Sequence, residues 1–155
     1  MFRFSLEAVL NLRIREVEVA QIALAEEMRR AGDLKRNIDH LAGVEQEKIG
    51  ELIQIETRGL KVAEYLLRRW HLDGLRARIE RLSQDLTRCQ EEVANRRQAL
   101  MEANKKKKMV ERLKEKAWQS YQEEERRRER KAVDEFSVLG YARTRGGRSE
   151  VSQTG

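Results

Sequence analysis

The chain has 155 residues, with no proline, 39% charged residues and 5% aromatic residues. The lack of proline removes the usual helix breaker, and so high a charged fraction leaves little apolar bulk for a thick globular core. The net charge of +6 allows an acidic partner, a nucleic acid or an anionic membrane. Because charges of both signs alternate along most of the chain, we expect one elongated helical domain with a solvated surface.

Several classes of function are not expected. Cys89 is the single cysteine, so no intrachain disulfide can form. The sequence has no Gly-rich phosphate loop, no HExxH or CxxC motif and no His cluster, so we expect no catalysis, cofactor, metal or small-molecule substrate. No apolar run of 18 residues and no N-terminal signal pattern occur, which favours a cytoplasmic protein.

A first helix is expected over about residues 5–56, because apolar residues recur there at three- and four-residue steps. Gly32, Gly43 and Gly50 each cost about 1 kcal/mol of helix propensity, so local bending or fraying is expected. The predicted stripe comprises Leu10, Ile14, Val17, Leu24, Met28, Ala31, Leu34, Ile38, Leu41, Ile49 and Leu52.

The best turn lies at about residues 57–60, where Gly59 suits the left-handed cap of an ending helix. Gly74 is a competing break. A turn at residues 57–60 folds the first helix back, antiparallel, against a second one. An apolar patch follows, which either closes the hairpin tip as core or forms an exposed docking surface: Tyr65, Leu66, Leu67, Trp70, Leu72 and Leu75.

A second helix is expected over about residues 61–139. Arg96 and Lys107 interrupt its seam, and Leu113 comes one residue early, as a local stutter would require. The predicted seam comprises Leu75, Ile79, Leu82, Leu86, Cys89, Val93, Leu100, Ala103, Val110, Leu113, Ala117 and Tyr121. The predicted fold is therefore all-α, a long antiparallel two-helix coiled coil over residues 1–140.

The charged stretches at residues 105–108 and 123–131 are either a solvated single helix or a polar shaft for an acidic partner. Gly140 is expected to stop the helix, and residues 141–155, rich in Gly, Ser, Thr and Arg, are expected to form a disordered tail.

The chain opens with Phe2-Arg3-Phe4-Ser5-Leu6-Glu7-Ala8-Val9-Leu10-Asn11-Leu12-Arg13 and continues to Glu27-Met28-Arg29-Arg30. Its closing part carries Tyr121, Glu124, Arg127, Arg128 and Lys131-Ala132-Val133-Asp134-Glu135-Phe136. In this order, the three stretches resemble the start of the flagellar export protein FliJ family, a stretch of its enterobacterial members and its C-terminal signature. The Arg/Gly/Ser-rich tail after Gly140 has no counterpart in this resemblance.

The resemblance implies a coiled coil similar to the gamma-subunit shaft of rotary ATP synthases. It implies a soluble, non-catalytic component of the flagellar type III export apparatus, and hence of motility and chemotaxis. Such a protein would bind the pore of the export ATPase hexamer (FliI-like) and the export-gate protein (FlhA-like), and would escort substrate chaperones. It would lie in the cytoplasm, peripherally associated with the inner membrane at the flagellar basal body.

Two interaction sites follow as hypotheses from the resemblance. The end opposite the turn would enter the ATPase pore through Phe2, Phe4, Leu6, Leu10, Arg13, Arg127, Arg128, Asp134, Glu135 and Phe136. The half nearer the turn would bind the export gate through Ile38, Ala42, Glu45, Ile49, Leu72, Leu75 and Ile79, although several of these also satisfy plain core packing.

Three alternatives stay open on the sequence. One is the equivalent, YscO-like stalk of a virulence type III secretion system. Another is a basic coiled coil that binds nucleic acid, which is disfavoured because no recognition fold or base-stacking aromatics occur. The third is a generic structural coiled coil or chaperone, which a parallel homodimer would favour.

Overall fold

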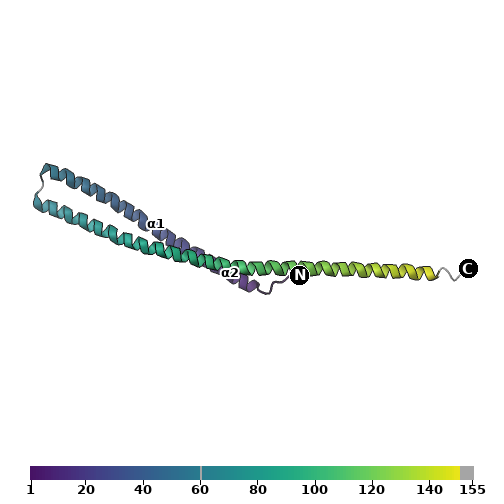
Figure 1. The fold of residues 1–155 in the computed structure, drawn as a ribbon. Coiled ribbons are helices and arrows are strands. Elements are labelled where there is room, and N and C mark those ends of the chain that lie inside the picture. Colours follow the sequence, from purple (N-terminus) through teal and green to yellow (C-terminus); the bar gives the residue numbers. More distant parts are fainter. Residues whose placement is uncertain (60, 151–155) are drawn as a thin grey trace. The chain divides into compact units, whose positions relative to one another are not determined.

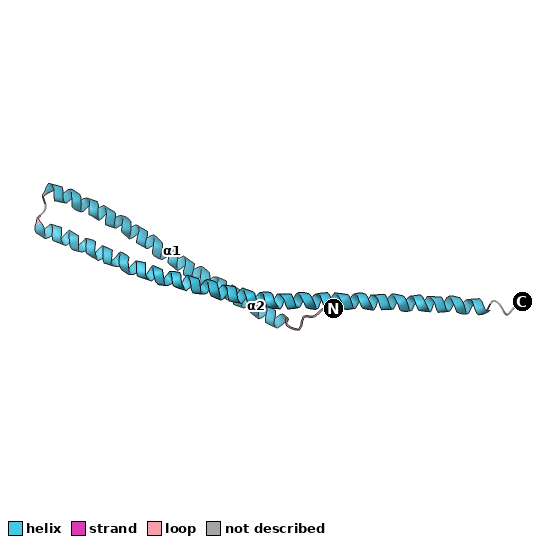
Figure 2. Ribbon diagram, in the orientation of Figure 1, coloured by secondary structure: helices cyan, strands magenta, loops and turns pink. Residues whose placement is uncertain are grey.

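The computed structural model describes residues 1–59 and 61–150, and within these ranges it contains two long helices, α1 (Glu7–Arg58) and α2 (Val62–Glu150), that pack against each other (Figures 1 and 2). The predicted all-α helical hairpin is therefore confirmed. The chain divides into two compact units. We call Leu12–Lys106 the hairpin unit, and Met1–Asn11 with Lys107–Gly155 the terminal unit.

The turn follows from Gly59. This residue has φ of +82°, a left-handed conformation that glycine adopts without steric cost, and its N–H donates to the carbonyl of Glu56 at 3.4 Å. Thr57 Oγ1 donates to the carbonyl of Gln54 at 2.6 Å, in the last turn of α1. The predicted reversal at Gly59 is thus present, whereas Gly74, the competing break, lies inside α2.

The hairpin unit holds a core one layer thick between the two helices. Its buried side chains are Val17, Leu41 and Leu52 from α1 and Leu72 and Cys89 from α2. Two ion pairs cross between the helices near the turn: Glu45–Arg76 at 2.7 Å and Glu51–Arg68 at 3.9 Å. Because a later residue of α1 pairs with an earlier residue of α2, the helices run antiparallel.

Two residues that were predicted to lie on the apolar stripes, Met28 and Leu113, do not lie there. Met28 is 47% exposed, and Glu27 takes the half-buried place instead. Leu113 is 49% exposed, and Lys114 is half-buried. In both cases the seam keeps its regular alternation of three- and four-residue steps, and this spacing places the polar residue, not the apolar one next to it, at the seam. The stutter predicted at Leu113 is therefore absent. A long side chain can bury its stem there and keep its charge in water.

The terminal unit places Met1–Asn11 along α2. Leu10 and Val110 are buried, and Lys114 Nζ lies 2.9 Å from a carboxylate oxygen of Glu7. Beyond Tyr121, the described α2 side chains as far as residue 146 are exposed except for the half-buried Glu125.

The predicted helix end near residue 139 is wrong, because α2 continues through Gly140 to Glu150. A single glycine costs about 1 kcal/mol in a helix, and no proline follows to break the helix outright. Thr144 Oγ1 donates to the Gly140 carbonyl at 3.1 Å within this helical stretch. Residues 151–155 of the expected disordered tail lie outside the described residues.

Candidate protein-interaction surfaces

The N-terminal residues of the hypothetical ATPase-pore site form an aromatic cluster with α2. The Phe2 ring meets Trp118 edge-on, with centroids 5.1 Å apart, and lies 5.5 Å from the Tyr121 ring. Phe4 is half-buried, Leu6 is 38% exposed and Leu10 is buried. Sequence reasoning missed Trp118, although its position three residues before Tyr121 puts the two rings on one helical face.

The C-terminal residues of the same hypothetical site lie apart from this cluster in the chain. Arg127, Arg128, Asp134, Glu135 and Phe136 are all exposed on α2. Arg128 pairs with Glu125 at 3.2 Å, and Phe136 is 78% exposed.

The structure does not gather the whole predicted pore set. The ring and ion-pair contacts of Phe2 and Glu7 go to Lys114, Trp118 and Tyr121. Arg13 belongs to the hairpin unit and pairs with Glu16 at 2.9 Å. Leu6 and the five C-terminal residues are therefore the part of the set that is exposed to solvent.

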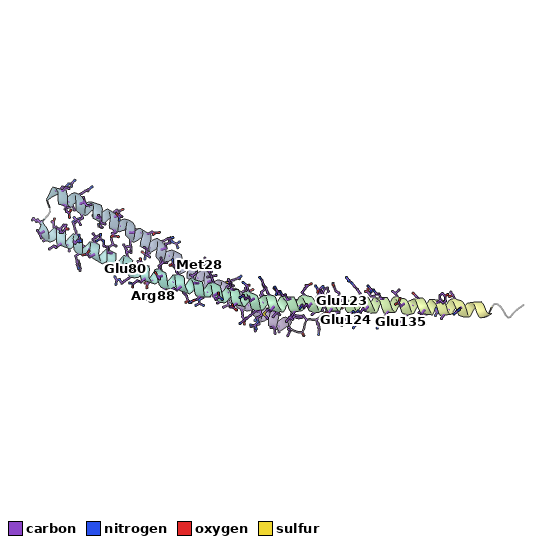
Figure 3. All side chains as sticks on the ribbon, in the orientation of Figure 1. Met28, Glu80, Arg88, Glu123, Glu124 and Glu135 are labelled. Carbon is purple, nitrogen blue, oxygen red and sulfur yellow. The ribbon has the colours of Figure 1, made fainter. Side chains whose placement is uncertain are left out.

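Residues 122–146 of α2, which we call the exposed part of α2, carry charged and apolar side chains that are almost all open to solvent. Glu123, Glu124 and Glu135 project from this single helix (Figure 3). Arg127, Asp134 and Glu135 form no hydrogen bond or ion pair with the described side chains. The large apolar residues on this stretch are 63–78% exposed: Val133, Phe136, Val138, Leu139 and Tyr141. Such a helix offers both charge and apolar area to a partner.

The residues of the hypothetical gate site lie mostly on the seam of the hairpin unit. Leu72 is 4% exposed, and Glu45 is held by the ion pair with Arg76. The remaining five are half-buried between α1 and α2: Ile38, Ala42, Ile49, Leu75 and Ile79. Core packing therefore accounts for Leu72, and the others combine packing with partial exposure.

A groove near the turn lies beside these residues, and we call it the tip groove. Its volume is about 550 Å³. Apolar lining comes from Val44, Leu52, Leu67, Leu72 and Leu75, with Lys48, Glu51, Arg68 and His71 around it.

Half of the apolar patch after the turn faces solvent. Leu66, Leu67 and Trp70 are 59%, 55% and 70% exposed, Tyr65 and Leu75 are half-buried, and Leu72 is core. The docking-surface interpretation therefore fits three of the six patch residues, and the core interpretation fits Leu72.

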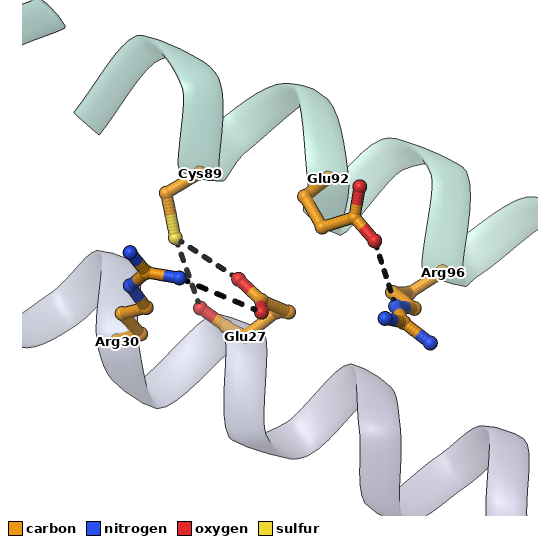
Figure 4. Close-up of polar contacts among 5 residues, drawn as sticks. All are labelled: Glu27, Arg30, Cys89, Glu92 and Arg96. Carbon is orange, nitrogen blue, oxygen red and sulfur yellow. Dashed lines mark hydrogen bonds and ion pairs between the residues drawn. The ribbon is translucent and has the colours of Figure 1, made fainter. Parts of the chain in front are cut away.

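The Cys89 thiol is a packed group of the hairpin seam. It donates toward Glu27, with Sγ 3.3 Å from Oε2 and 3.5 Å from the backbone carbonyl oxygen, and Arg30 lies at 4.0 Å from Oε1 of Glu27 (Figure 4). Burial raises the pKa of the Cys89 thiol, and the hydrogen bond to Glu27 and its negative charge add to the effect. A protonated, buried thiol is a poor nucleophile.

Within the described part of the chain, no group of three or more His, Cys, Asp and Glu residues could hold a metal ion. The same residues include no helix with an apolar stretch sufficient to cross a bilayer.

Comparison with known proteins agrees with the fold and reveals the family. The solved structure of CT670 from Chlamydia trachomatis, described as a YscO homologue, superimposes with a TM-score of 0.57 at 18% sequence identity. The match covers 94% of this chain and 99% of that one, and at this identity it shows a common fold. The comparison with curated protein sequences gave no match. Residues 2–146 match the family described as "Flagellar FliJ protein", and the chain therefore belongs to the FliJ family.

Proposed function

We propose that the protein is a non-catalytic stalk of a bacterial type III protein export apparatus. The match to the FliJ family over residues 2–146 carries this proposal. The helical hairpin, with an exposed stretch of α2 after Tyr121, supplies the kind of surface that such a stalk needs. The stalk would act in the cytoplasm, peripherally at the inner membrane, and would also meet substrate chaperones.

The exposed part of α2 is the proposed contact with the pore of the export ATPase hexamer. Arg127 and Arg128 stand exposed beside Asp134, Glu135 and Phe136, on a helix that α1 does not cover. Arg127, Asp134 and Glu135 form no ion pair with the described side chains, so they can pair with the pore lining without first breaking one. Arg128 would exchange its pair with Glu125. Phe136 would add apolar area that is already exposed before binding.

The test is the ATPase rate of the purified cognate export ATPase, measured with and without the protein. We expect stimulation by the wild type and loss of most of it in the double variant Arg127→Glu, Arg128→Glu. Arg81→Glu with Arg88→Glu is the matched control. Both arginines are exposed on α2 in the hairpin unit, and neither forms an ion pair with a residue that the structure describes. Equal stimulation by the two double variants, with equal helicity by circular dichroism, would contradict the pore assignment.

The tip groove and the exposed residues beside it are the proposed contact with the export gate. Leu72 and Leu75, from the predicted gate set, line the groove, and Leu67 adds an exposed apolar wall. A groove of this kind can accept an apolar side chain from a flexible linker segment of the gate protein.

A pull-down with the cytoplasmic linker of the gate protein tests this contact. Leu67→Asp should reduce capture roughly tenfold or more, because it puts a charge into the apolar wall. Met28→Asp is the control, since Met28 is similarly exposed in the same unit. If both variants are captured as well as the wild type, the gate does not bind at the tip groove.

A second candidate is the corresponding stalk of a virulence type III secretion system. The likeness in fold to CT670, described as a YscO homologue, favours it. A deletion strain separates the two functions. Loss of swimming with normal effector secretion would support the flagellar role, and the opposite pattern would support the virulence role.

A further inference from the structure

A second groove lies on the hairpin unit, between residues 12–23 of α1 and residues 96–106 of α2. We call it the base groove; it has a volume of about 620 Å³ and has no lining residue in common with the tip groove. Small side chains from both helices line it: Ala20, Ala23, Ala99 and Ala103. Small residues let another helix approach two backbones closely.

Large apolar residues stand exposed along this face of α1. Leu12 and Val19 line the groove and are 52% and 67% exposed, and Ile22 beside them is 61% exposed. Steps of seven and three residues put all three on one helical face, separate from the buried Val17 of the seam. A two-helix coiled coil buries one apolar stripe on each helix, so the packing of α1 against α2 leaves this second stripe of α1 exposed.

The dimensions of the groove suit a helical ligand. The α1 wall, residues 12–23, extends about 18 Å at 1.5 Å per residue, which is about three helical turns. Its walls are the side chains of two helices, and helices offer no free backbone edge to which an extended peptide could add as a strand. A third helix laid along the groove would cover Leu12, Val19 and the alanines together.

The charges at the groove select the occupant. Glu16 is bound to Arg13 at 2.9 Å, Glu102 to Lys105 at 3.5 Å, and Arg96 to Glu92 at 2.9 Å. Arg15 and Lys106 also line the groove and form no ion pair or hydrogen bond with the described side chains. The charges left without partners are thus both positive, which favours a ligand with carboxylates at its flanks.

We propose that the base groove binds an amphipathic helix of another protein, about three turns long, whose large apolar side chains are flanked by Asp or Glu. This binding face is additional to the two surfaces of the proposed function. A second copy of the chain fits less well. Its exposed apolar stretch on α2 contains Asp134 and Glu135, but residues 126–131 directly before it carry five cationic residues and one carboxylate, and this excess of positive charge would repel Arg15 and Lys106.

A designed helical peptide and the full-length protein test the proposal. The peptide has leucines at heptad spacing flanked by glutamates, and the matched control peptide has lysines in place of the glutamates. Fluorescence anisotropy should show binding of the acidic peptide, at least about tenfold weaker binding of the lysine peptide, and weakening by added salt. Arg15→Glu with Lys106→Glu should reverse the preference.

Two groove variants locate the binding. Val19→Asp and Ala99→Trp should each weaken the acidic peptide about tenfold, one by placing a charge on the apolar wall and the other by filling the groove. Both original residues are exposed, so the fold should be kept, and circular dichroism checks this. Ile53→Asp, at an exposed apolar residue elsewhere on the hairpin unit, is the control and should bind as the wild type does.

The proposal is overturned if the acidic peptide does not bind, if the two peptides bind equally, or if neither groove variant weakens binding. It is also overturned if light scattering shows a dimer that Val19→Asp dissociates, because a second copy would then be the occupant. ATPase stimulation by Val19→Asp should equal that of the wild type. A failure of the base groove is therefore distinguishable from a failure of the proposed stalk function.

Discussion

Cys89 illustrates how one side chain of the seam is constrained by its neighbours. Its thiol is buried and directed toward Glu27, whose own side chain is half-buried where the apolar Met28 was expected. The carboxylate would be costly at this place without a partner, and the thiol and Arg30 supply two. The contact between Cys89 and Glu27 makes the seam locally polar, and the negative charge of Glu27 favours the protonated thiol.

We predict that iodoacetamide alkylates Cys89 roughly tenfold more slowly in the folded protein than in urea at about pH 8, because the raised pKa and burial both reduce the available thiolate. Mass spectrometry gives the rates. Glu27→Gln should speed the reaction in the folded protein, since it removes the negative charge that disfavours the thiolate. Equal rates for the folded and unfolded wild type would contradict this picture.

The same raised pKa affects stability in one direction. The folded state keeps its proton at a pH where the unfolded thiol loses it, so this stabilisation is complete below the ordinary thiol pKa of 9.0 and is lost as the pH rises through the folded value. Urea titrations at neutral and alkaline pH should show a smaller loss of stability in Cys89→Ser than in the wild type.

Phe2 is a second residue with a local and testable role. We predict that Phe2→Ala loosens the N-terminal segment, because aromatic pairs such as Phe2–Trp118 contribute about 0.5–1.5 kcal/mol beyond the area they bury. Hydrogen exchange at the amides of residues 7–10 should become faster. Val62→Ala, at an exposed residue, is the control, and unchanged exchange in Phe2→Ala would show that the cluster does not hold the segment.

At the scale of elements, the hairpin unit contains glycines with opposite conformational requirements, some inside its helices and one in the turn between them. Gly43, Gly50 and Gly74 lie inside helices, and a Cβ added there would meet nothing within 4 Å. Gly59 also has open space, but its positive φ strains any residue with a Cβ. The helical glycines therefore weaken the arms near the turn, and Gly59 builds the turn itself.

We predict that Gly50→Ala stabilises the protein by about 1 kcal/mol and that Gly59→Ala destabilises it by about 1 kcal/mol. The first gains helix propensity, and the second forces an L-residue into the left-handed region. Urea unfolding followed by circular dichroism gives both values. Shifts of the same sign in the two variants would contradict the assignment of Gly59 as the turn residue.

At the scale of the whole molecule, the two units differ in how much of α2 is covered. In the hairpin unit, α1 covers α2 along a seam that includes Leu72 and Cys89 and is interrupted at the exposed Arg96. In the terminal unit, the described residues of α2 after Tyr121 carry almost entirely exposed side chains. An uncovered helix has only its backbone hydrogen bonds and local pairs such as Glu125–Arg128 to stabilise it, and such helices are marginal in water.

We predict that amides of residues 122–146 exchange on the order of 100-fold faster than those of the hairpin seam, because they open without disturbing any packed core. Hydrogen exchange with mass spectrometry measures this. The same residues should become protected when the export ATPase is added, if they are its contact. Uniform protection along α2 in the absence of the export ATPase would contradict this prediction, because residues 122–146 would then have to be covered by another partner.

The amino-acid sequence by itself determined that two long helices form, where the turn between them lies, and the family, but not where the second helix ends. Absence of proline and a sustained heptad pattern specify long helices, and Gly59 specifies the reversal, because these depend on local backbone preferences. The family could be inferred from residues at the two ends of the chain, and the match over residues 2–146 shows it. The pore and gate sites remain predictions.

The tertiary structure decided which neighbour occupies each seam position. Adjacent residues on a helix differ by about 100° in direction, so the opposing helix decides between Glu27 and Met28, and between Lys114 and Leu113. The partners of Phe2, Cys89 and Glu45 follow from pairing between distant segments, which no local preference specifies. The two grooves depend on the same pairing, because each is walled by both helices and exists only once their register is set.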